Sequence, residues 1–267
     1  MKEIVLALAM LLTTLFPALS QQTQKPLPAP TVFAQMDSYV AAQVDTTCPM
    51  SFYLIFREDR PFQGREISSI VLDEAREVLY QEYMVSESKH LTTCNGVSIV
   101  GKMYFSSAGH YELSSIKIHF FDGSMEEYPI GRLVVDVYDD VGSEVLYTWS
   151  TPALSSLPDC FGFTYDLADA TERDVTFVRA EMNLLAEVKL LKAEIETSYA
   201  SGKTALVAEF EFASEKPVVY RFVLPRVFIL VDGKENVIYP KVGCFCGGAQ
   251  VTEEHVLAVY EAWYPEK

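Results

Sequence analysis

Residues 120–152 read FFDGSMEEYPIGRLVVDVYDDVGSEVLYTWSTP, and a degraded copy, LVDGKENVIYPKVGCFCGGAQVTEEHVLAVYEAWYP, occupies residues 230–265. Both stretches contain Asp-Gly, Tyr-Pro, Gly, Tyr and Trp in the same order. The offset between matching residues grows slowly, from 110 between Asp122 and Asp232 to 114 between Trp149 and Trp263. Small loop insertions leave such a drift in a duplicated domain. The sequence therefore predicts two related domains in tandem, at residues 31–152 and 153–267.

The first 20 residues have the pattern of a secretory signal peptide. Lys2 precedes an apolar run from Ile4 to Leu12, and Ala18-Leu19-Ser20 matches a small-residue cleavage site. An uncleaved membrane anchor is the alternative, but the run is shorter than the about 20 residues that span a bilayer. Residues 21–30, QQTQKPLPAP, predict an extended Pro/Gln-rich tether. We expect a protein that is secreted or held in the cell envelope, with no membrane insertion after cleavage.

Composition sets limits on the fold and on the partners. Apolar residues make up 49% of the chain and aromatic residues 12%, enough to bury two ordinary cores and unlike a disordered protein. The formal net charge is −16, which repels nucleic acid and anionic lipid surfaces. An acidic surface is usual for solubility, so the charge alone names no ligand.

Alternating apolar residues predict the strands. Ile116-Lys117-Ile118-His119-Phe120 alternates strictly before an Asp122-Gly123 turn, and Leu206, Ala208, Phe210 and Phe212 share one face of another strand. Each copy contains about seven short strands, separated by turn signals at roughly 8–12-residue spacing, as in an antiparallel β-sandwich. In strand count and size this resembles immunoglobulin-like or fibronectin-like architecture. The predicted fold class is therefore all-β, with two tandem antiparallel sandwiches.

Some local assignments are less clear. Asn95-Gly96 and Ser201-Gly202 predict hairpin turns. Residues 70–85 and 178–195 fit either strands or a helical stripe; strands are favoured, and a short helix in each domain is the alternative. Both tryptophans are expected in the last strand of their domain.

Five cysteines in an exported chain indicate disulfides with one cysteine left over. Cys48 and Cys160 lie at equivalent positions of the repeat. Cys94 is the expected partner of Cys48, whereas Cys160 could pair with Cys244 or Cys246.

Two weak ligand sites can be named. Cys244 and Cys246 would share one face of a strand and could bind a soft metal with His255, although one Cys-x-Cys pair lacks the second ligand pair of a zinc site. Asp139, Asp140 and Glu144 form an acidic turn, without the twelve-residue pattern of an EF-hand. Buried or bridged cysteines and a solvated acidic turn are the simpler interpretations.

The chain has no nucleophile elbow, H-E-x-x-H motif, phosphate-binding glycine loop or dinucleotide fingerprint, so no catalytic residue and no cofactor are predicted. The favoured function is an exported, non-catalytic binding or structural module for an unknown protein or carbohydrate. The alternative is a secreted hydrolase or carbohydrate-active protein with a carboxylate pair in the cleft between its domains.

Overall fold

A computed structural model describes residues 32–56, 61–73, 78–88, 95–140, 147–152, 160–167, 173–197, 202–239, 244–246 and 252–263. The predicted signal peptide and tether lie outside these ranges.

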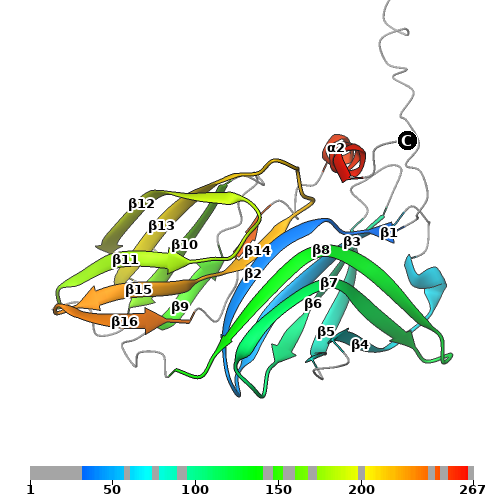
Figure 1. The fold of residues 1–267 in the computed structure, drawn as a ribbon, viewed down its shortest axis with the longest axis horizontal. Helices are drawn as coiled ribbons and strands as arrows, with labels where there is room; N and C mark the ends of the chain where they lie inside the picture. Colours follow the sequence, from blue (N-terminus) through cyan, green and yellow to red (C-terminus); the bar gives the residue numbers. More distant parts are fainter. Residues whose placement is uncertain are drawn as a thin grey trace, which may run out of the picture.

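The first eight strands form one curved sheet, paired in the order β1-β3-β6-β5-β4-β7-β8-β2 (Figure 1). Their bounds are β1 Val32–Phe33, β2 Met36–Gln43, β3 Thr47–Phe56, β4 Ile67–Asp73, β5 Val78–Ser88, β6 Asn95–Tyr104, β7 Gly109–Phe120 and β8 Met125–Tyr138. A 3-10 helix, η1 (Pro61–Gly64), lies between β3 and β4. If the strands are lettered in chain order, with β1 and β2 sharing the letter A, the sheet reads A-B-E-D and then C-F-G. These are the two half-sheets of an immunoglobulin constant-type domain, joined here because β4 pairs with β5.

The second group of strands repeats this order in two separate sheets. One sheet is β12-β13-β10-β9 and the other is β11-β15-β16, or D-E-B-A and C-F-G. Their bounds are β9 Tyr147–Pro152, β10 Cys160–Leu167, β11 Val175–Glu181, β12 Glu187–Thr197, β13 Thr204–Ala213, β15 Arg226–Val231 and β16 Lys234–Ile238. Both groups have an Asp-Gly turn between F and G, at Asp122-Gly123 and Asp232-Gly233. The all-β, immunoglobulin-like prediction is confirmed, with the addition that β2 pairs in parallel with β8.

We call the β1–β8 group the first unit and the two smaller sheets the second unit. Three elements join them: β14 (Arg221–Leu224), β17 (Cys244–Cys246) and α2 (Glu253–Trp263). After β13 the chain leaves the second unit, and β14 pairs in parallel with β2, so that it extends the sheet of the first unit. β17 then pairs with β14 on its other side.

The sequence of β14 explains its position. Residues 218–224 read VVYRFVL, and every one of them is buried. Apart from Arg221, which faces Asp37, the run is apolar on both faces, as in strands that are covered on both sides, whereas half-exposed strands alternate.

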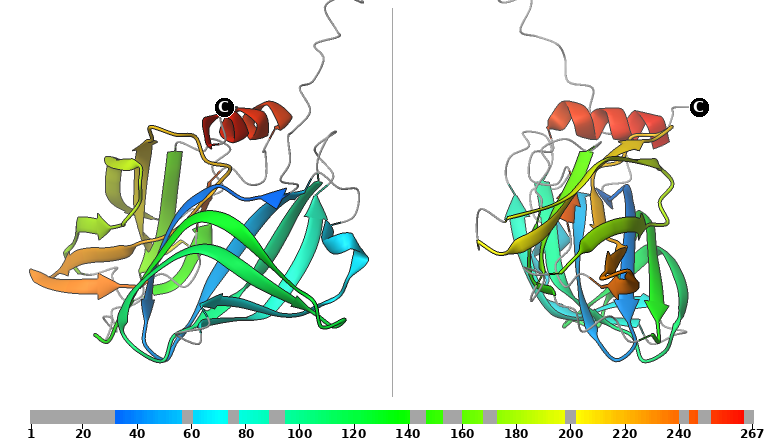
Figure 2. Two further views of the ribbon diagram at one scale, coloured as in Figure 1. Left: turned by 45° about the vertical axis from the view of Figure 1, so that its right-hand side comes forward. Right: turned by 90° about the vertical axis from the view of Figure 1, so that its left-hand side faces the viewer.

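The helix α2 covers the junction of the two units (Figures 1 and 2). Thr252 caps it, because its side-chain oxygen accepts the His255 N–H at 3.2 Å, and Glu253 and Glu254 favour the positive end of the helix dipole. Val256 and Tyr260 lie one turn apart on the buried face, packed into the core of the first unit.

The core of the first unit therefore contains residues from both halves of the chain. Val219, Tyr220 and Phe222 belong to this core together with the buried face of α2. A second core lies between the two smaller sheets, and a third apolar cluster, at the junction, contains Tyr39, Val134 and Tyr239. The division of the chain at residue 152 stays a prediction. β9, which ends at Pro152, pairs with β10 of the second unit, and the packing of the first core also crosses this division.

Several local predictions are confirmed. Ile116, Ile118 and Phe120 are buried, and so are the four apolar residues that alternate along β13. Residues 70–85 and 178–195 contain strands and no helix in their described parts. The hairpin at Gly202 is present, with a φ of 67° at this glycine.

Two local predictions are wrong. Asn95 and Gly96 are not a turn but the start of β6, opposite Phe56 and Ile55. Gly96 is needed there because a Cβ atom would lie 1.9 Å from the Tyr53 hydroxyl, so this glycine permits close packing. Neither tryptophan lies in the last strand of its domain: Trp149 is in β9, the first strand of the second unit, and Trp263 is in α2, the capped helix that replaces the strand predicted from the repeat.

Replacing Gly131 with alanine should destabilise the fold by about 2–3 kcal/mol, since both a positive φ and a steric clash oppose the new side chain. Gly131 has a φ of 87°, and a Cβ atom would lie 2.5 Å from the Met36 carbonyl oxygen. The matched control is Gly123→Ala, where φ is 85° but no atom lies within 4 Å, so only the cost of the positive φ remains. Urea unfolding of both variants measures the difference; equal losses would contradict the role of the clash.

Candidate functional site

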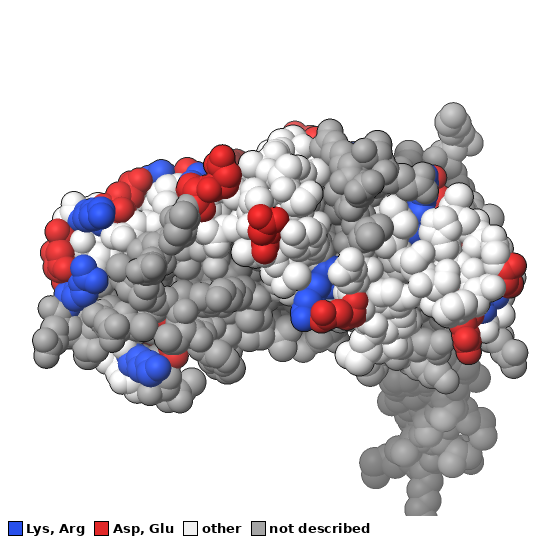
Figure 3. All heavy atoms as spheres, turned by 90° about the horizontal axis from the view of Figure 1, so that it is seen from below, with Lys and Arg blue, Asp and Glu red and all other residues white. Residues whose placement is uncertain are grey.

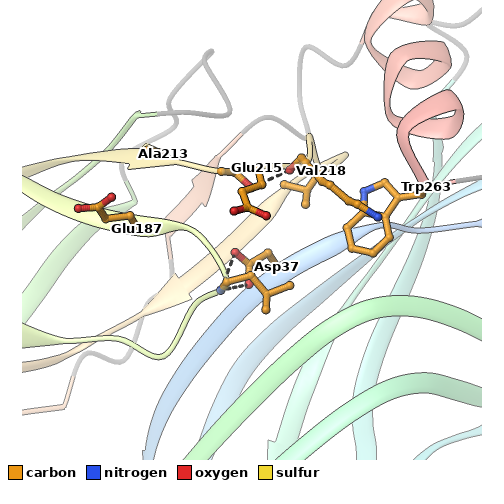
Figure 4. Close-up of a pocket in the computed structure, with 9 residues that line it drawn as sticks. Asp37, Glu187, Ala213, Glu215, Val218 and Trp263 are labelled. Atoms are coloured by element: carbon orange, nitrogen blue, oxygen red, sulfur yellow. Dashed lines mark hydrogen bonds between the residues drawn. The ribbon is translucent and has the colours of Figure 1, made fainter.

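A groove of about 570 Å³ lies between the two units and α2 (Figure 4). Its lining comes from four parts of the chain: β2, the start of β12 with the turn before it, the end of β13 with the segment after it, and the end of α2. The residues are Asp37, Leu185, Glu187, Ala213, Ser214, Glu215, Lys216, Val218 and Trp263. Its volume is in the usual range for a small-molecule or side-chain pocket.

Asp37 forms the floor of the groove and ties the units together. Its side chain is 1% exposed. One carboxylate oxygen accepts the Leu185 N–H at 2.9 Å, and the other accepts the Ala186 N–H at 3.1 Å. Two guanidinium groups neutralise it: Arg221 Nε lies 3.7 Å and Arg132 Nη1 lies 4.0 Å from its oxygens. A buried carboxylate is stable only with such partners, so Asp37 has a structural role.

Further contacts fix the junction on either side of Asp37. Arg132 of β8 donates to the backbone oxygen of Asn183 at 3.0 Å and to its side-chain oxygen at 3.2 Å. Arg226 of β15 forms an ion pair with Asp140, and its guanidinium carbon lies 4.0 Å from the centroid of the Tyr138 ring. Tyr239 also donates a hydrogen bond to Asp140. The two units are thus held by polar contacts as well as by β14, and the groove is preformed.

One wall of the groove is an indole ring in a fixed position. The Trp263 Nε1–H donates to the carbonyl oxygen of Pro217 at 2.7 Å. On the same helix, His255 Nε2 lies 2.9 Å from the carbonyl oxygen of Val218. The ammonium of Lys216 lies 4.9 Å from the centroid of the Trp263 ring. The segment at residues 216–218 therefore holds α2 at two points and covers the ring with its own cation.

Two exposed carboxylates complete the groove. Glu187 begins β12 and Glu215 follows β13, and both are exposed. Figure 4 shows Glu187 at the end of the groove away from Trp263, with Glu215 between them above Asp37. Sequence reasoning did not select any of these groove residues as a site. A sequence feature that could have indicated the groove is the polar segment at residues 214–217, which interrupts the apolar residues before and after it.

The predicted acidic turn is only partly a surface feature. Asp139 is exposed, whereas Asp140 is half-buried and bonded to Arg226 and Tyr239. Glu144 lies outside the described residues. Asp140 therefore contributes to the junction of the units rather than to an open ligand site.

One of the three predicted metal ligands, His255, makes a structural contact instead. His255 is bonded to the backbone of Val218, as described above. Cys244 and Cys246 are the ends of β17, opposite Val223 and Arg221 of β14. Within the described part of the chain, no group of three or more His, Cys, Asp or Glu side chains is arranged to hold a metal.

The strand register argues against the predicted Cys48–Cys94 bridge. Cys48 pairs with Met103, while Asn95, the neighbour of Cys94, pairs with Phe56 at the other end of β3. At about 3.3 Å per residue this separation is roughly 26 Å, whereas bridged cysteines need Cα atoms within about 7 Å. Cys48 is a free, buried thiol in the structure, and Cys94 lies outside the described residues.

The strand register is compatible with the second predicted disulfide, which involves Cys160. Cys160 begins β10, and the backbones of β10 and β17 lie next to each other. The pairing of Cys160 with Cys244 or Cys246 therefore stays a prediction.

Cys48 should resist alkylation in the folded protein, because burial raises the pKa of its thiol from 9.0 to about 12 and only the thiolate reacts readily. We expect iodoacetamide at pH 8 to modify Cys48 at least about 100-fold more slowly in the native than in the urea-unfolded state. The unfolded thiol ionises first, so the stability that this group contributes is present below pH 9 and is lost as the pH rises toward 12. Recovery of Cys48 in a disulfide-linked peptide would contradict this prediction.

The strand order and the groove together define a class: a tandem immunoglobulin-like protein whose two units are fixed around a shared groove. No protein-family model and no curated protein matches the chain. Solved structures with similar arrangements of strands include a chimeric titin Z1Z2 carrying an exogenous decorin peptide, the adhesin FdeC of Escherichia coli and the D00-D0 domain of intimin.

The titin chimera is 10% identical, with 85% of this chain and 99% of that chain covered and a TM-score of 0.23. FdeC is 13% identical, with coverage of 81% and 63% and a TM-score of 0.23. The intimin domain is 10% identical, with coverage of 81% and 96% and a TM-score of 0.19. At such TM-scores the similarity carries no argument, so the fold assignment rests on the strand order.

Proposed function

We propose that this chain is an exported, non-catalytic binding module that holds its ligand in the groove between its two immunoglobulin-like units. The observation that carries the proposal is that the groove is preformed by buried contacts: the Asp37 carboxylate, the Arg132–Asn183 bonds and the β14 strand fix its walls. A preformed site binds without the entropic cost of ordering its walls.

The surface supports a protein or carbohydrate ligand rather than nucleic acid. Figure 3 shows acidic and basic side chains side by side on the face seen from below, without a continuous basic patch among the described residues. The net charge of −16 also disfavours a polyanion. Among the described residues, no helix is long and apolar enough to span a membrane.

Export is part of the proposal and is supported by the signal pattern of residues 1–20. Expression of the full chain, followed by sequencing of the mature N-terminus, tests it. We expect the mature protein to begin at Gln21 and to be found outside the cytoplasm; an intact Met1 on protein retained in the cytoplasm would refute export.

Occupancy of the groove can be tested with a variant that fills it. A single-tryptophan protein, Trp149→Phe, makes Trp263 the reporter of the groove. This variant is screened by fluorescence against panels of soluble glycans and capped peptides. Any compound that binds should lose its effect when Ala213, an exposed residue of the lining, is replaced by phenylalanine.

Ala108→Phe is the matched control, because Ala108 is exposed but belongs to the first unit, away from the lining. An equal loss of binding in both variants, or an affinity that Ala213→Phe leaves unchanged, would refute the groove as the ligand site.

A second candidate function, a secreted hydrolase, is favoured by the three carboxylates of the groove. Asp37 is already bonded to two backbone N–H groups and two arginines, which leaves Glu187 and Glu215 as the possible acid and base. Both are exposed, whereas a general acid usually needs a desolvated environment. Release of reducing sugar from a glycan panel that disappears in Glu215→Gln would establish the hydrolase instead of the module.

A further inference from the structure

The Trp263 ring already holds a cation of the chain itself. The Lys216 ammonium lies 4.9 Å from the ring centroid, within the distance at which an aromatic face attracts a cation. Lys216 is exposed and lines the groove together with the ring. An exposed ammonium group on a half-buried indole ring is weakly held and can be exchanged for another cation.

The ring does not depend on Lys216 for its position. Trp263 is oriented by the hydrogen bond from its Nε1 to the Pro217 carbonyl oxygen, and α2 is held by the buried face around Val256 and Tyr260. If Lys216 moves away, the indole face stays in place and opens toward the groove.

The charges around the groove favour a positive ligand group. Glu187 and Glu215 contribute two negative charges and Lys216 one positive charge. The Asp37 carboxylate is neutralised by Arg132 and Arg221 beneath the groove. A cation that replaced Lys216 on the ring would therefore have Glu215 on its groove side, with Glu187 further along the groove, and the net charge of −16 would favour its approach.

We propose that the groove receives a lysine or arginine side chain of a partner polypeptide, which displaces Lys216 from the face of Trp263 and lies on the side of the ring toward Glu215. This inference rests on the proposed function of the groove as the ligand site. An aromatic face with a carboxylate beside it is a common arrangement for ammonium and guanidinium groups.

The test compares two peptides that differ only in charge. Capped Gly-Arg-Gly and capped Gly-citrulline-Gly are titrated into the Trp149→Phe protein, with Trp263 fluorescence as the readout. Citrulline has the shape of arginine without its charge, so its peptide should bind at least about fivefold more weakly. Raising the salt concentration should weaken only the arginine peptide.

Two groove variants separate the parts of the proposal. Lys216→Met keeps an apolar stem but removes the competing cation, so the arginine peptide should bind about threefold more tightly. Glu215→Gln should weaken it about two- to fivefold. The control is Glu211→Gln, because Glu211 is an exposed glutamate of β13 outside the groove lining, and this variant should leave binding unchanged.

Equal binding of the two peptides, or an affinity that Lys216→Met leaves unchanged, would overturn the inference. If a neutral glycan binds and is blocked by Ala213→Phe while the arginine peptide does not bind, the cationic ligand is refuted but the groove module stands. If no compound of either panel is affected by Ala213→Phe, both proposals fail.

Discussion

Replacing Tyr220 with alanine is expected to lower the free energy of unfolding by about 3–5 kcal/mol, the range for truncating a buried aromatic side chain. Tyr220 is 0% exposed and lies just before β14, in the half of the chain assigned to the second domain. Its hydroxyl accepts the Tyr53 N–H at 2.8 Å, and its ring packs edge-on against Tyr53 at 6.1 Å between centroids. The alanine variant loses both contacts and leaves a cavity in the first unit.

The control for Tyr220→Ala is Phe121→Ala, because Phe121 is also aromatic but 74% exposed, at the tip of the β7–β8 hairpin. Tyr220→Phe should cost only about 0.5–1.5 kcal/mol, since it removes a hydrogen bond and keeps the ring. Urea unfolding followed by circular dichroism measures all three. A loss below about 1 kcal/mol for Tyr220→Ala would show that the first unit does not need the segment before β14.

Replacing Asp37 with asparagine should be nearly as damaging, at about 3 kcal/mol or more. Removing one partner of a buried ion pair leaves the other charge without compensation. The asparagine amide keeps the shape but cannot neutralise Arg132 and Arg221, and because it has a single acceptor oxygen, the N–H of either Leu185 or Ala186 faces its NH₂ group and loses its acceptor. We therefore expect both lower stability and a looser junction between the units.

Two measurements separate these effects of Asp37→Asn. Urea unfolding gives the stability, and amide hydrogen exchange at Leu185 and Ala186 reports the junction directly. Asp139→Asn is the control, because Asp139 is exposed and lies near the same junction. Unchanged protection of the Leu185 and Ala186 amides in Asp37→Asn would contradict the role of the carboxylate.

Local patterns predicted the strands well because they depend on neighbours in the sequence. The alternation along β13 and in β7, together with the Asp-Gly turn at Asp122, was enough to identify sandwich strands and their buried faces. The repeat also placed Asp122 and Asp232 at equivalent turns, which the strand order supports.

The junction could not be predicted because it depends on contacts between distant residues. β14 pairs with β2, although Val223 and Tyr39 are far apart in the sequence. The residues of the groove come from four separate segments, and nothing in the sequence around Asp37 marks it as a buried ion-pair partner. At Gly96 a residue typical of turns is required by the Tyr53 ring of a neighbouring strand, which no local pattern reveals.

The position of the first and last described elements has a mechanical consequence. β1 pairs with β3 in the first unit, and α2 packs on the core of the same unit. A pulling force applied at residues 32 and 263 would therefore be carried by the first unit and by the attachment of α2, without stretching the second sandwich. As long as α2 stays attached, the second unit would therefore act as a side arm that carries none of the tension.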